Sequence, residues 1–192
     1  MPRVANHAIE PLILNRFSPR AMNGQPLTDA LLLQVLEAAR WAPSAANFQP
    51  WRFLYAQAGR PEFAQFLTFL DTYNAEWCVN AGALLIVLSK TTTPDGKPLG
   101  PHAFDAGAAW MALALQASAL GLVGHALGGI FADKIRAELA IPAEFAIHCA
   151  VALGHKGDIA ALPERLRPRE TPSDRRPLAE SIAAGAFPPA WK

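Results

Sequence analysis

The chain has 192 residues, of which 52% are hydrophobic and 17% are charged. This length suits a single domain over residues 1–192 with a sizeable core, which excludes disorder of the whole chain. The formal net charge of +1 is too small for a general nucleic-acid-binding surface, so no nucleic-acid partner is expected. Because the apolar fraction is high for a soluble protein, we expect part of the apolar surface to be shared with another subunit.

Helices and strands alternate in the first half of the chain. Residues 1–14 are predicted to form a short arm, and Thr28 is a candidate N-cap for a helix that ends near Trp41, before Pro43. An aromatic strand is expected over residues 51–56, followed by a helix that Pro61 opens. The apolar run 84–88 indicates a central buried strand, and the polar stretch 89–101 indicates a surface loop.

A long helix is predicted over residues 104–120. No Asp, Glu, Lys or Arg occurs from residue 106 to residue 132, a length that would reach across a bilayer. The stretch is rich in Ala and is interrupted by glycines, however, so a helix buried on most sides is favoured over a membrane span. We therefore expect no membrane partner.

The last part of the chain is predicted to end in an extended arm. After the glycine-rich stretch 121–129, Asp133 is expected to cap a short helix through Leu139, and residues 145–153 to form another buried strand. Residues 160–192 contain six of the 17 prolines, a composition typical of an extended C-terminal arm. The order of elements indicates an α+β fold or a three-layer α/β sandwich.

The cysteines and histidines predict neither a disulfide nor a metal site. Cys78 and Cys149 lie far apart in apolar surroundings, so we expect both to be reduced core residues of a cytoplasmic protein. No apolar stretch long enough for a secretion signal precedes Arg16. The five histidines include no i,i+4 pair, and the Rossmann, P-loop and zinc-protease signatures are absent.

Three short motifs each allow a binding role and a structural one. Arg16-x-Ser18-x-Arg20 places two guanidinium groups and a hydroxyl in a phosphate-binding arrangement, or forms a solvated basic turn. The loop 43–51 carries a hydroxyl and two amides that match the edge of a planar heterocycle, or that satisfy their own backbone. The paired glycines at 128–129 allow a ligand to approach the backbone, or form an ordinary turn.

In combination these motifs resemble the nitroreductase family of FMN-dependent NAD(P)H oxidoreductases. The resemblance runs over residues 11–178 and includes the basic motif at 16–20, the APSxxNxQPW element at 42–51, Asn74, the glycine pair and a late arginine, Arg175. It implies an α+β fold, a three-layer α/β/α sandwich with a mostly antiparallel central sheet. It also implies a homodimer with an extended C-terminal arm and with FMN at the subunit interface.

The resemblance assigns a role to most of these residues. Arg16, Ser18 and Arg175 would hold the FMN phosphate, Arg20 would lie toward the pyrimidine end of the flavin, and Asn74 would bind the pyrimidine edge. Loop residues Ser44, Ala45 and Asn47 would come from the partner subunit, and backbone N–H groups around the glycine pair would face flavin N5. The candidate cofactor-binding residues are Arg16, Phe17, Ser18, Arg20, Pro43, Ser44, Ala45, Asn47, Gln49, Asn74, Leu127, Gly128, Gly129 and Arg175.

Two residues depart from the pattern of the family. Ala45 stands where many members have a second serine, and Trp77 stands where some members carry a lysine near the flavin. Arg20 is then the only candidate cation at the pyrimidine end. No catalytic side chain and no metal ligand is assigned, whereas His102, Phe104 and Trp110 are candidates for a substrate wall, with helix packing as the simpler role for Trp110.

The implied activity is a ping-pong hydride transfer. NADH or NADPH would reduce FMN and depart, and a nitroaromatic, a quinone or a related small electron acceptor would then occupy the same face. A flavoprotein of the same fold that carries or senses FMN without catalysis is the main alternative. A flavin-free phosphate-binding module is a third interpretation, because the basic motif alone has little specificity.

Overall fold

The centre of the molecule is a four-stranded antiparallel sheet. The computed structural model describes residues 3–189, so the outermost residues of both predicted arms lie outside the described part. The strands are β1 (Trp51–Gln57), β2 (Ala83–Lys90), β3 (Leu122–Leu127) and β4 (Phe145–His155), in the order β1-β2-β4-β3. β2 is buried along nearly its whole length, as expected of a central strand whose two faces are both covered.

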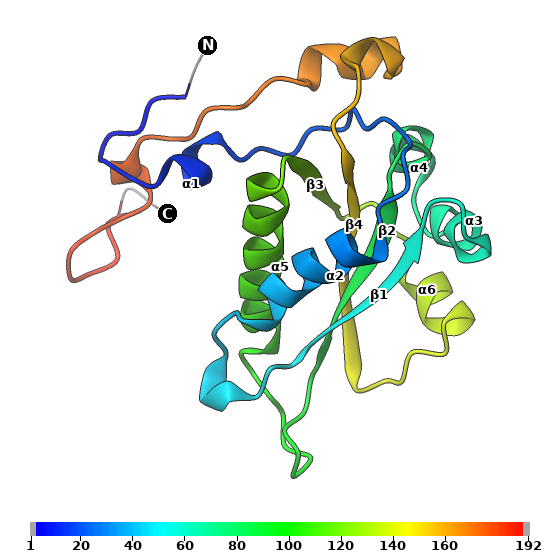
Figure 1. Ribbon diagram of the computed structural model, residues 1–192. Coiled ribbons are helices and arrows are strands. Elements are labelled where there is room, and N and C mark those ends of the chain that lie inside the picture. The colour runs from blue at the N-terminus through cyan, green and yellow to red at the C-terminus, as the bar shows by residue number, and fades with distance from the viewer. Residues whose placement is uncertain (1–2, 190–192) are drawn as a thin grey trace.

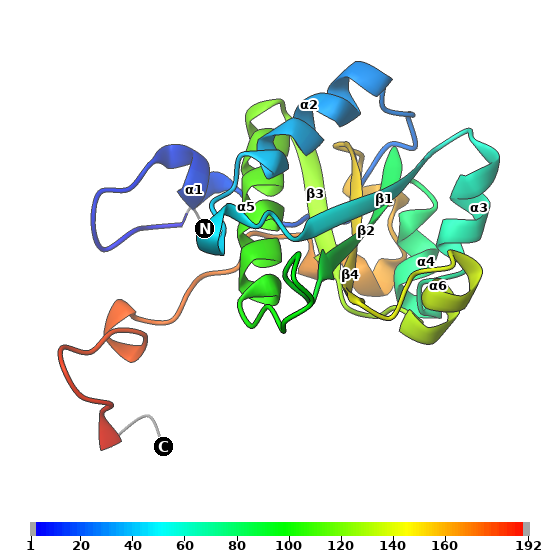
Figure 2. The same ribbon diagram turned by 90° about the horizontal axis from the view of Figure 1, so that it is seen from below.

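Helices cover both faces of the sheet (Figures 1 and 2). Helices α2 (Asp29–Arg40) and α5 (His102–Ala119) pack on one face, and α3 (Pro61–Leu67), α4 (Thr72–Cys78) and α6 (Ala132–Glu138) pack on the other. Alternate residues of β2 divide between the two cores: Leu85 faces α2 and α5, whereas Leu84 and Ile86 face the other three helices. The predicted three-layer α/β/α sandwich is therefore confirmed.

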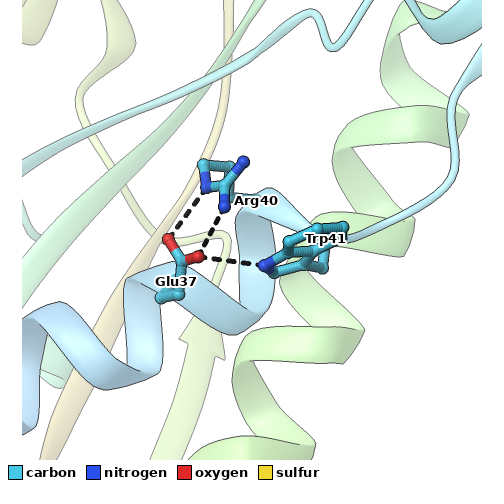
Figure 3. A network of polar contacts seen from close by, with 3 residues as sticks. All are labelled: Glu37, Arg40 and Trp41. Carbon is cyan, nitrogen blue, oxygen red and sulfur yellow. Dashed lines mark hydrogen bonds and ion pairs between the residues drawn. The ribbon is translucent and has the colours of Figure 1, made fainter.

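The predicted N-cap of α2 is observed, and a side-chain network that the sequence did not predict lies at its other end. The Thr28 hydroxyl accepts a hydrogen bond from the backbone N–H of Leu31 at 3.3 Å, which caps the helix. At the other end the Glu37 carboxylate accepts bonds from Arg40 at 2.5 and 2.8 Å and from Trp41 Nε1 at 2.9 Å (Figure 3). The Arg40 and Trp41 bonds lower the pKa of Glu37 to about 2. This network holds Trp41 at the point where the loop after α2 begins.

Two elements near the candidate site differ from the sequence predictions. Helix α4 occupies a stretch for which no element was predicted, and strand β3 lies inside the segment expected to be a glycine-rich connection. Trp110 of α5 lies over the internal glycine of β3: a Cβ at Gly124 would lie 3.7 Å from the Trp110 ring, an ordinary van der Waals distance. The glycine therefore does not mark a break, because the pairing of β3 with β4 continues through it.

Smaller corrections concern the ends of two elements. Asp133 does not cap α6 but lies within its first turn, and the N-cap position is taken by Phe131, which makes no capping bond. A short helix, α1 (Pro11–Asn15), interrupts the predicted N-terminal arm. Helix α5 begins two residues earlier than expected, at His102.

The predicted C-terminal arm is extended only in its second part. Residues 159–161, 164–169 and 178–180 form 3-10 turns, and Leu162 and Leu166 are buried in the core beneath α3, α4 and α6. The prediction of an unpacked arm from residue 160 is therefore wrong for its first eleven residues, since apolar side chains anchor them. Beyond Glu170 the arm is exposed and returns toward the N-terminal segment (Figure 1), where Arg3 donates a bond to the Ser173 carbonyl at 2.8 Å.

Both cysteines are free thiols. Cys78 is buried and Cys149 is half-buried, and burial raises the pKa of Cys149 to about 11. Between residues 3 and 189, no helix has the length and apolar character needed to span a membrane. In the same range no group of three or more potential metal ligands is found.

Candidate cofactor-binding site

Arginines from both ends of the chain line one cavity of about 250 Å³. The segment after α1 contributes the predicted phosphate-binding residues, the C-terminal arm contributes further arginines, and β3 contributes a histidine. Because these segments are far apart in sequence, no local pattern indicated that Arg3, His125 and Arg169 belong to the same site. The lining residues are Arg3, Arg16, Phe17, Ser18, Arg20, His125, Arg169, Thr171, Ser173 and Arg175.

The cavity is strongly positive and its donors are only partly used by the protein. Arg16 Nη1 lies 3.4 Å from Ser18 Oγ, and Arg175 donates mainly to backbone carbonyls of its own arm. Burial and then the charges of Arg3 and Arg175 lower the pKa of Arg16. The Nε atoms of Arg16 and Arg20 are buried and have no hydrogen-bond partner. Clustered guanidinium groups with unused donors suit a phosphate group.

A buried carboxylate fixes the backbone of the basic motif. Glu170, which is 6% exposed, follows the second 3-10 turn of the C-terminal region. Its Oε1 atom accepts bonds from the backbone N–H groups of Arg20 at 2.6 Å and Ala21 at 2.7 Å. Sequence reasoning missed Glu170, since nothing around it distinguishes it from an exposed acidic residue. The C-terminal region therefore positions the arginine motif as well as supplying arginines of its own.

Residues of β3 and α4 extend the site beyond the arginines. The ring of His125 lies 5.0 Å from that of Trp77, and its Nδ1 lies 3.2 Å from the Pro19 carbonyl. Trp77 is one turn after Asn74 on α4, so the two side chains lie on the same side of that helix. α4 thus links the arginine cavity to the predicted pyrimidine-binding asparagine.

The glycine pair lies directly against α4. The backbone N–H of Asp71 donates to the Gly129 carbonyl at 3.0 Å, and a Cβ at Gly129 would overlap Asp71 Oδ2 and lie 2.5 Å from Asn74 Nδ2. At Gly128, which is exposed and follows the buried Leu127, an added Cβ would meet nothing within 4 Å. The structure therefore brings Asn74 and the glycine pair together, with open space on the Gly128 side.

The loop 43–50 is shaped by its own hydrogen bonds. Ser44 Oγ accepts from the Gln49 backbone N–H at 3.0 Å, and Gln49 Nε2 donates to the Asn47 carbonyl at 3.0 Å. These bonds correspond to the alternative in which loop side chains satisfy the loop backbone. Asn47 and Gln49 nevertheless have positive φ values of 56° and 49°, a left-handed conformation that costs free energy in non-glycine residues.

This loop does not meet the arginine cavity within one chain. Ala45 N–H donates to Asp105 Oδ2 at 3.2 Å in the first turn of α5, whereas Arg16 and Phe17 line a small cavity with Ser118 at the other end of that helix. At 1.5 Å per residue, Asp105 and Ser118 are about 20 Å apart along the helix axis. Figure 1 shows the loop and the segment after α1 at opposite ends of α5.

The three candidates for a substrate wall have different surroundings. His102 Nδ1 and the buried Ser89 hydroxyl are 2.7 Å apart, and the same hydroxyl lies 2.6 Å from His148 Nε2. Trp110 packs between α5 and β3, as the simpler interpretation of this residue predicted. Phe104 is 81% exposed and, among the three, has the surface most available to another molecule.

Comparisons with known proteins bear on the family of the chain. The sequence model described as "Nitroreductase family" matches residues 13–67, which include the basic motif and the loop after α2. A crystal structure of an oxidoreductase containing FMN is 44% identical, with a TM-score of 0.94 over 97% of this chain and 96% of that chain. A second crystal structure, of a provisionally assigned nitroreductase from Desulfovibrio desulfuricans in complex with FMN, is 28% identical. Its TM-score is 0.75 over 94% of this chain and 100% of that chain.

A shorter match comes from Streptomyces coelicolor. A protein provisionally named as an NADH dehydrogenase/NAD(P)H nitroreductase is 31% identical over 87 residues, 45% of this chain. The match spans 43% of that relative, which is less than half of its length. The family match covers the arginine motif, and the structural likeness at 44% identity covers nearly all of both chains. The chain belongs to the nitroreductase family.

Proposed function

We propose that the protein is an FMN-dependent oxidoreductase that uses NADH or NADPH to reduce small electron acceptors such as nitroaromatics and quinones. The arginine cavity carries this proposal. The Nε atoms of Arg16 and Arg20 are buried there without partners, and the family resemblance implies the FMN phosphate at Arg16 and the pyrimidine end of the flavin at Arg20. Support also comes from the oxidoreductase containing FMN to which the chain is 44% identical.

The residues of the cavity, together with Asn74 of the neighbouring α4, suit the two ends of FMN. Arg16, Ser18 and Arg175 offer charged and neutral donors to the phosphate, and Arg169 adds a further positive charge. Asn74 can both donate and accept, which matches the alternating groups of the pyrimidine edge. Arg20 supplies a fixed positive charge that stabilises negative charge developing on reduction. Bound FMN would supply hydride transfer from the nicotinamide to the acceptor.

A second copy of the chain would complete the site. The loop 43–50 lies about 20 Å along α5 from the arginine segment, so in one chain it cannot contact a group held there. Trp41 just before this loop, Phe48 within it and Phe104 beside its partner Asp105 are 73%, 39% and 81% exposed, a large apolar surface for a monomer. A homodimer with FMN at the interface would bury these side chains and bring the partner's loop to the cofactor. Sedimentation velocity of the purified protein tests whether it is a dimer in solution.

One experiment separates this function from its alternatives. The visible spectrum of the purified protein is recorded with excess FMN, before and after anaerobic addition of NADH or NADPH. Loss of the bound flavin absorbance within seconds, followed by recovery on adding a quinone, supports the reductase. Bound flavin that stays oxidised with both nucleotides would instead support an FMN carrier or sensor. A protein that binds no FMN would refute both.

A further inference from the structure

The arginine cavity contains one histidine, His125 of β3. Its Nδ1 lies 3.2 Å from the Pro19 carbonyl oxygen, and because a carbonyl only accepts, Nδ1 carries the hydrogen in this contact. Nε2 then holds the lone pair of the neutral ring. Contact with Trp77 at 5.0 Å fixes the position of the imidazole. The cavity therefore has a proton-accepting nitrogen on a side chain whose orientation is set from two sides.

The charges around His125 favour the neutral ring in the free protein. Burial and then the positive charge of Arg20 lower the pKa of His125, while the bond to the Pro19 carbonyl, the carboxylate of Glu170 and the backbone of Ser18 act in the opposite direction. α4 presents the uncharged Trp77 to the ring, and β4 places Ala152 beside His125 in the sheet. The other charged residues of the cavity are all arginines: Arg3, Arg16, Arg169 and Arg175.

We propose that His125 stores the second proton of the reaction: it is neutral while FMN is oxidised and binds a proton at Nε2 when FMN is reduced. This inference rests on the proposed function. Hydride from NAD(P)H brings two electrons and one proton to the cofactor, which leaves one net negative charge there. A proton from solvent then binds His125 and balances that charge. When the acceptor takes the hydride, the charge is lost and His125 releases the proton, which supplies the second hydrogen of the reduced acceptor.

The position of His125 explains why a titratable group suits this site. Trp77, a neutral residue, stands where some members of the family have a lysine, so Arg20 is the fixed cation beside the pyrimidine end in the proposed site. His125 contacts Trp77 and is close enough to Arg20 for that charge to affect its pKa. A group that becomes positive only after reduction stabilises the reduced cofactor without adding repulsion among the arginines beforehand. Because a buried site has low polarity, the attraction between a protonated His125 and the reduced cofactor is stronger there than in water.

A direct test follows the ring of His125 by NMR. The histidine Cε1–H signals are titrated in the apoprotein, in the FMN-loaded oxidised protein and in the same sample reduced anaerobically with dithionite, and the signal missing in His125→Asn identifies the residue. We expect the midpoint of His125 to rise by at least one pH unit on reduction, a tenfold change in proton affinity. The same midpoint in the oxidised and reduced protein would overturn the inference.

The reduction potential provides a second readout. Each proton taken up with the electrons changes the reduction equilibrium tenfold per pH unit, which equals about 30 mV for a two-electron couple. Between the midpoint of His125 in the oxidised protein and its midpoint in the reduced protein, we therefore expect the potential of the wild type to fall more steeply with pH than that of His125→Asn, by up to about 30 mV per pH unit. Asparagine keeps a donor near the position of Nδ1 for the Pro19 carbonyl but does not titrate.

A matched control and the separate failure modes complete the test. His155→Gln removes another histidine of the sheet, at the end of β4 and outside the arginine cavity, and should keep the slope of the wild type. Equal slopes in the wild type and His125→Asn, in a protein that binds and reduces FMN, would refute the role of His125 alone. Absence of FMN binding would refute the proposed function and this inference together.

Discussion

Gly129→Ala should test two roles of the glycine pair: its packing against α4 and its position beside the proposed flavin site. The backbone at residue 129 does not need a left-handed conformation, so alanine is acceptable to the main chain. The added methyl group, however, overlaps the carboxylate of Asp71 and lies 2.5 Å from Asn74 Nδ2. Asp71 also caps α4, because its Oδ1 accepts from the Asn74 N–H at 2.7 Å. The substitution should therefore displace the cap and the asparagine together.

The expected magnitude follows from these two contacts. Overpacking of a close contact costs about 1–3 kcal/mol, and loss of an aspartate cap adds about 1 kcal/mol. The free energy of unfolding of Gly129→Ala should then fall by about 2–4 kcal/mol. If Asn74 makes two hydrogen bonds of about 1 kcal/mol each to the flavin, its displacement weakens FMN binding about 30-fold.

Urea unfolding of the apoprotein and fluorescence titration with FMN measure the two effects. Gly128→Ala is the matched control for stability, because its added methyl group meets nothing within 4 Å and should change the unfolding free energy by less than about 0.5 kcal/mol. Equal stability of the two variants would show that Asp71 and Asn74 do not pack on Gly129 as described. A destabilised Gly129→Ala with unchanged FMN affinity would remove Asn74 from the cofactor site.

Three further predictions concern charge. Arg16→Ala should weaken FMN binding about 10- to 150-fold, since a charged hydrogen bond to phosphate contributes about 1.5–3 kcal/mol. Arg60→Ala, at the start of α3, is the control and should leave the affinity for FMN unchanged. Equal FMN affinities of the two variants in a fluorescence titration would exclude Arg16 from the cofactor site. Because the pKa of Glu37 is about 2 in the folded chain against an ordinary 4.5, the stabilisation by its bonds to Arg40 is present above pH 4.5 and is lost as the pH falls through 2. The urea midpoint of Glu37→Gln should therefore fall less than that of the wild type between pH 5 and pH 2. Burial raises the pKa of Cys149 to about 11, so this thiol should not react with a thiol reagent at pH 8 until urea unfolds the protein. Rapid labelling of Cys149 in the folded chain would contradict the described burial.

Local patterns predicted the elements whose stability depends on nearby residues. Thr28 and the apolar spacing after it indicated α2, because an N-cap residue and a helical period can be recognised in the local sequence. The run 84–88 indicated the strand β2, because a strand buried on both faces is continuously apolar. β3 was missed because its glycines usually mark turns. Here Gly124 pairs with Leu153 of β4 and lies beneath Trp110 of α5, and neither tertiary contact can be inferred from the local sequence.

The candidate site was predictable as a set of motifs but not as an arrangement. The resemblance to the family supplied Arg16, Asn74 and the glycine pair, and the structure places the last two in contact. Glu170 and His125 were missed, since each gains its role from segments distant in the chain: Glu170 binds the backbone of residues 20–21, and His125 lines the cavity from β3. Such roles depend on the tertiary fold and cannot be inferred from the spacing of residues along the sequence.

The proposed site also couples cofactor binding to the ordering of both chain ends. The phosphate-binding motif follows α1, its backbone is held by Glu170, and Arg3 joins the N-terminal segment to the exposed arm at Ser173. A phosphate bound among Arg16, Arg169 and Arg175 would bridge segments that otherwise repel one another. A ligand that binds only the folded chain stabilises it by about 2.7 kcal/mol at a hundred times its Kd. The same free energy would also oppose any local opening that separates the N-terminal motif from the C-terminal arm, because such an opening destroys the proposed site.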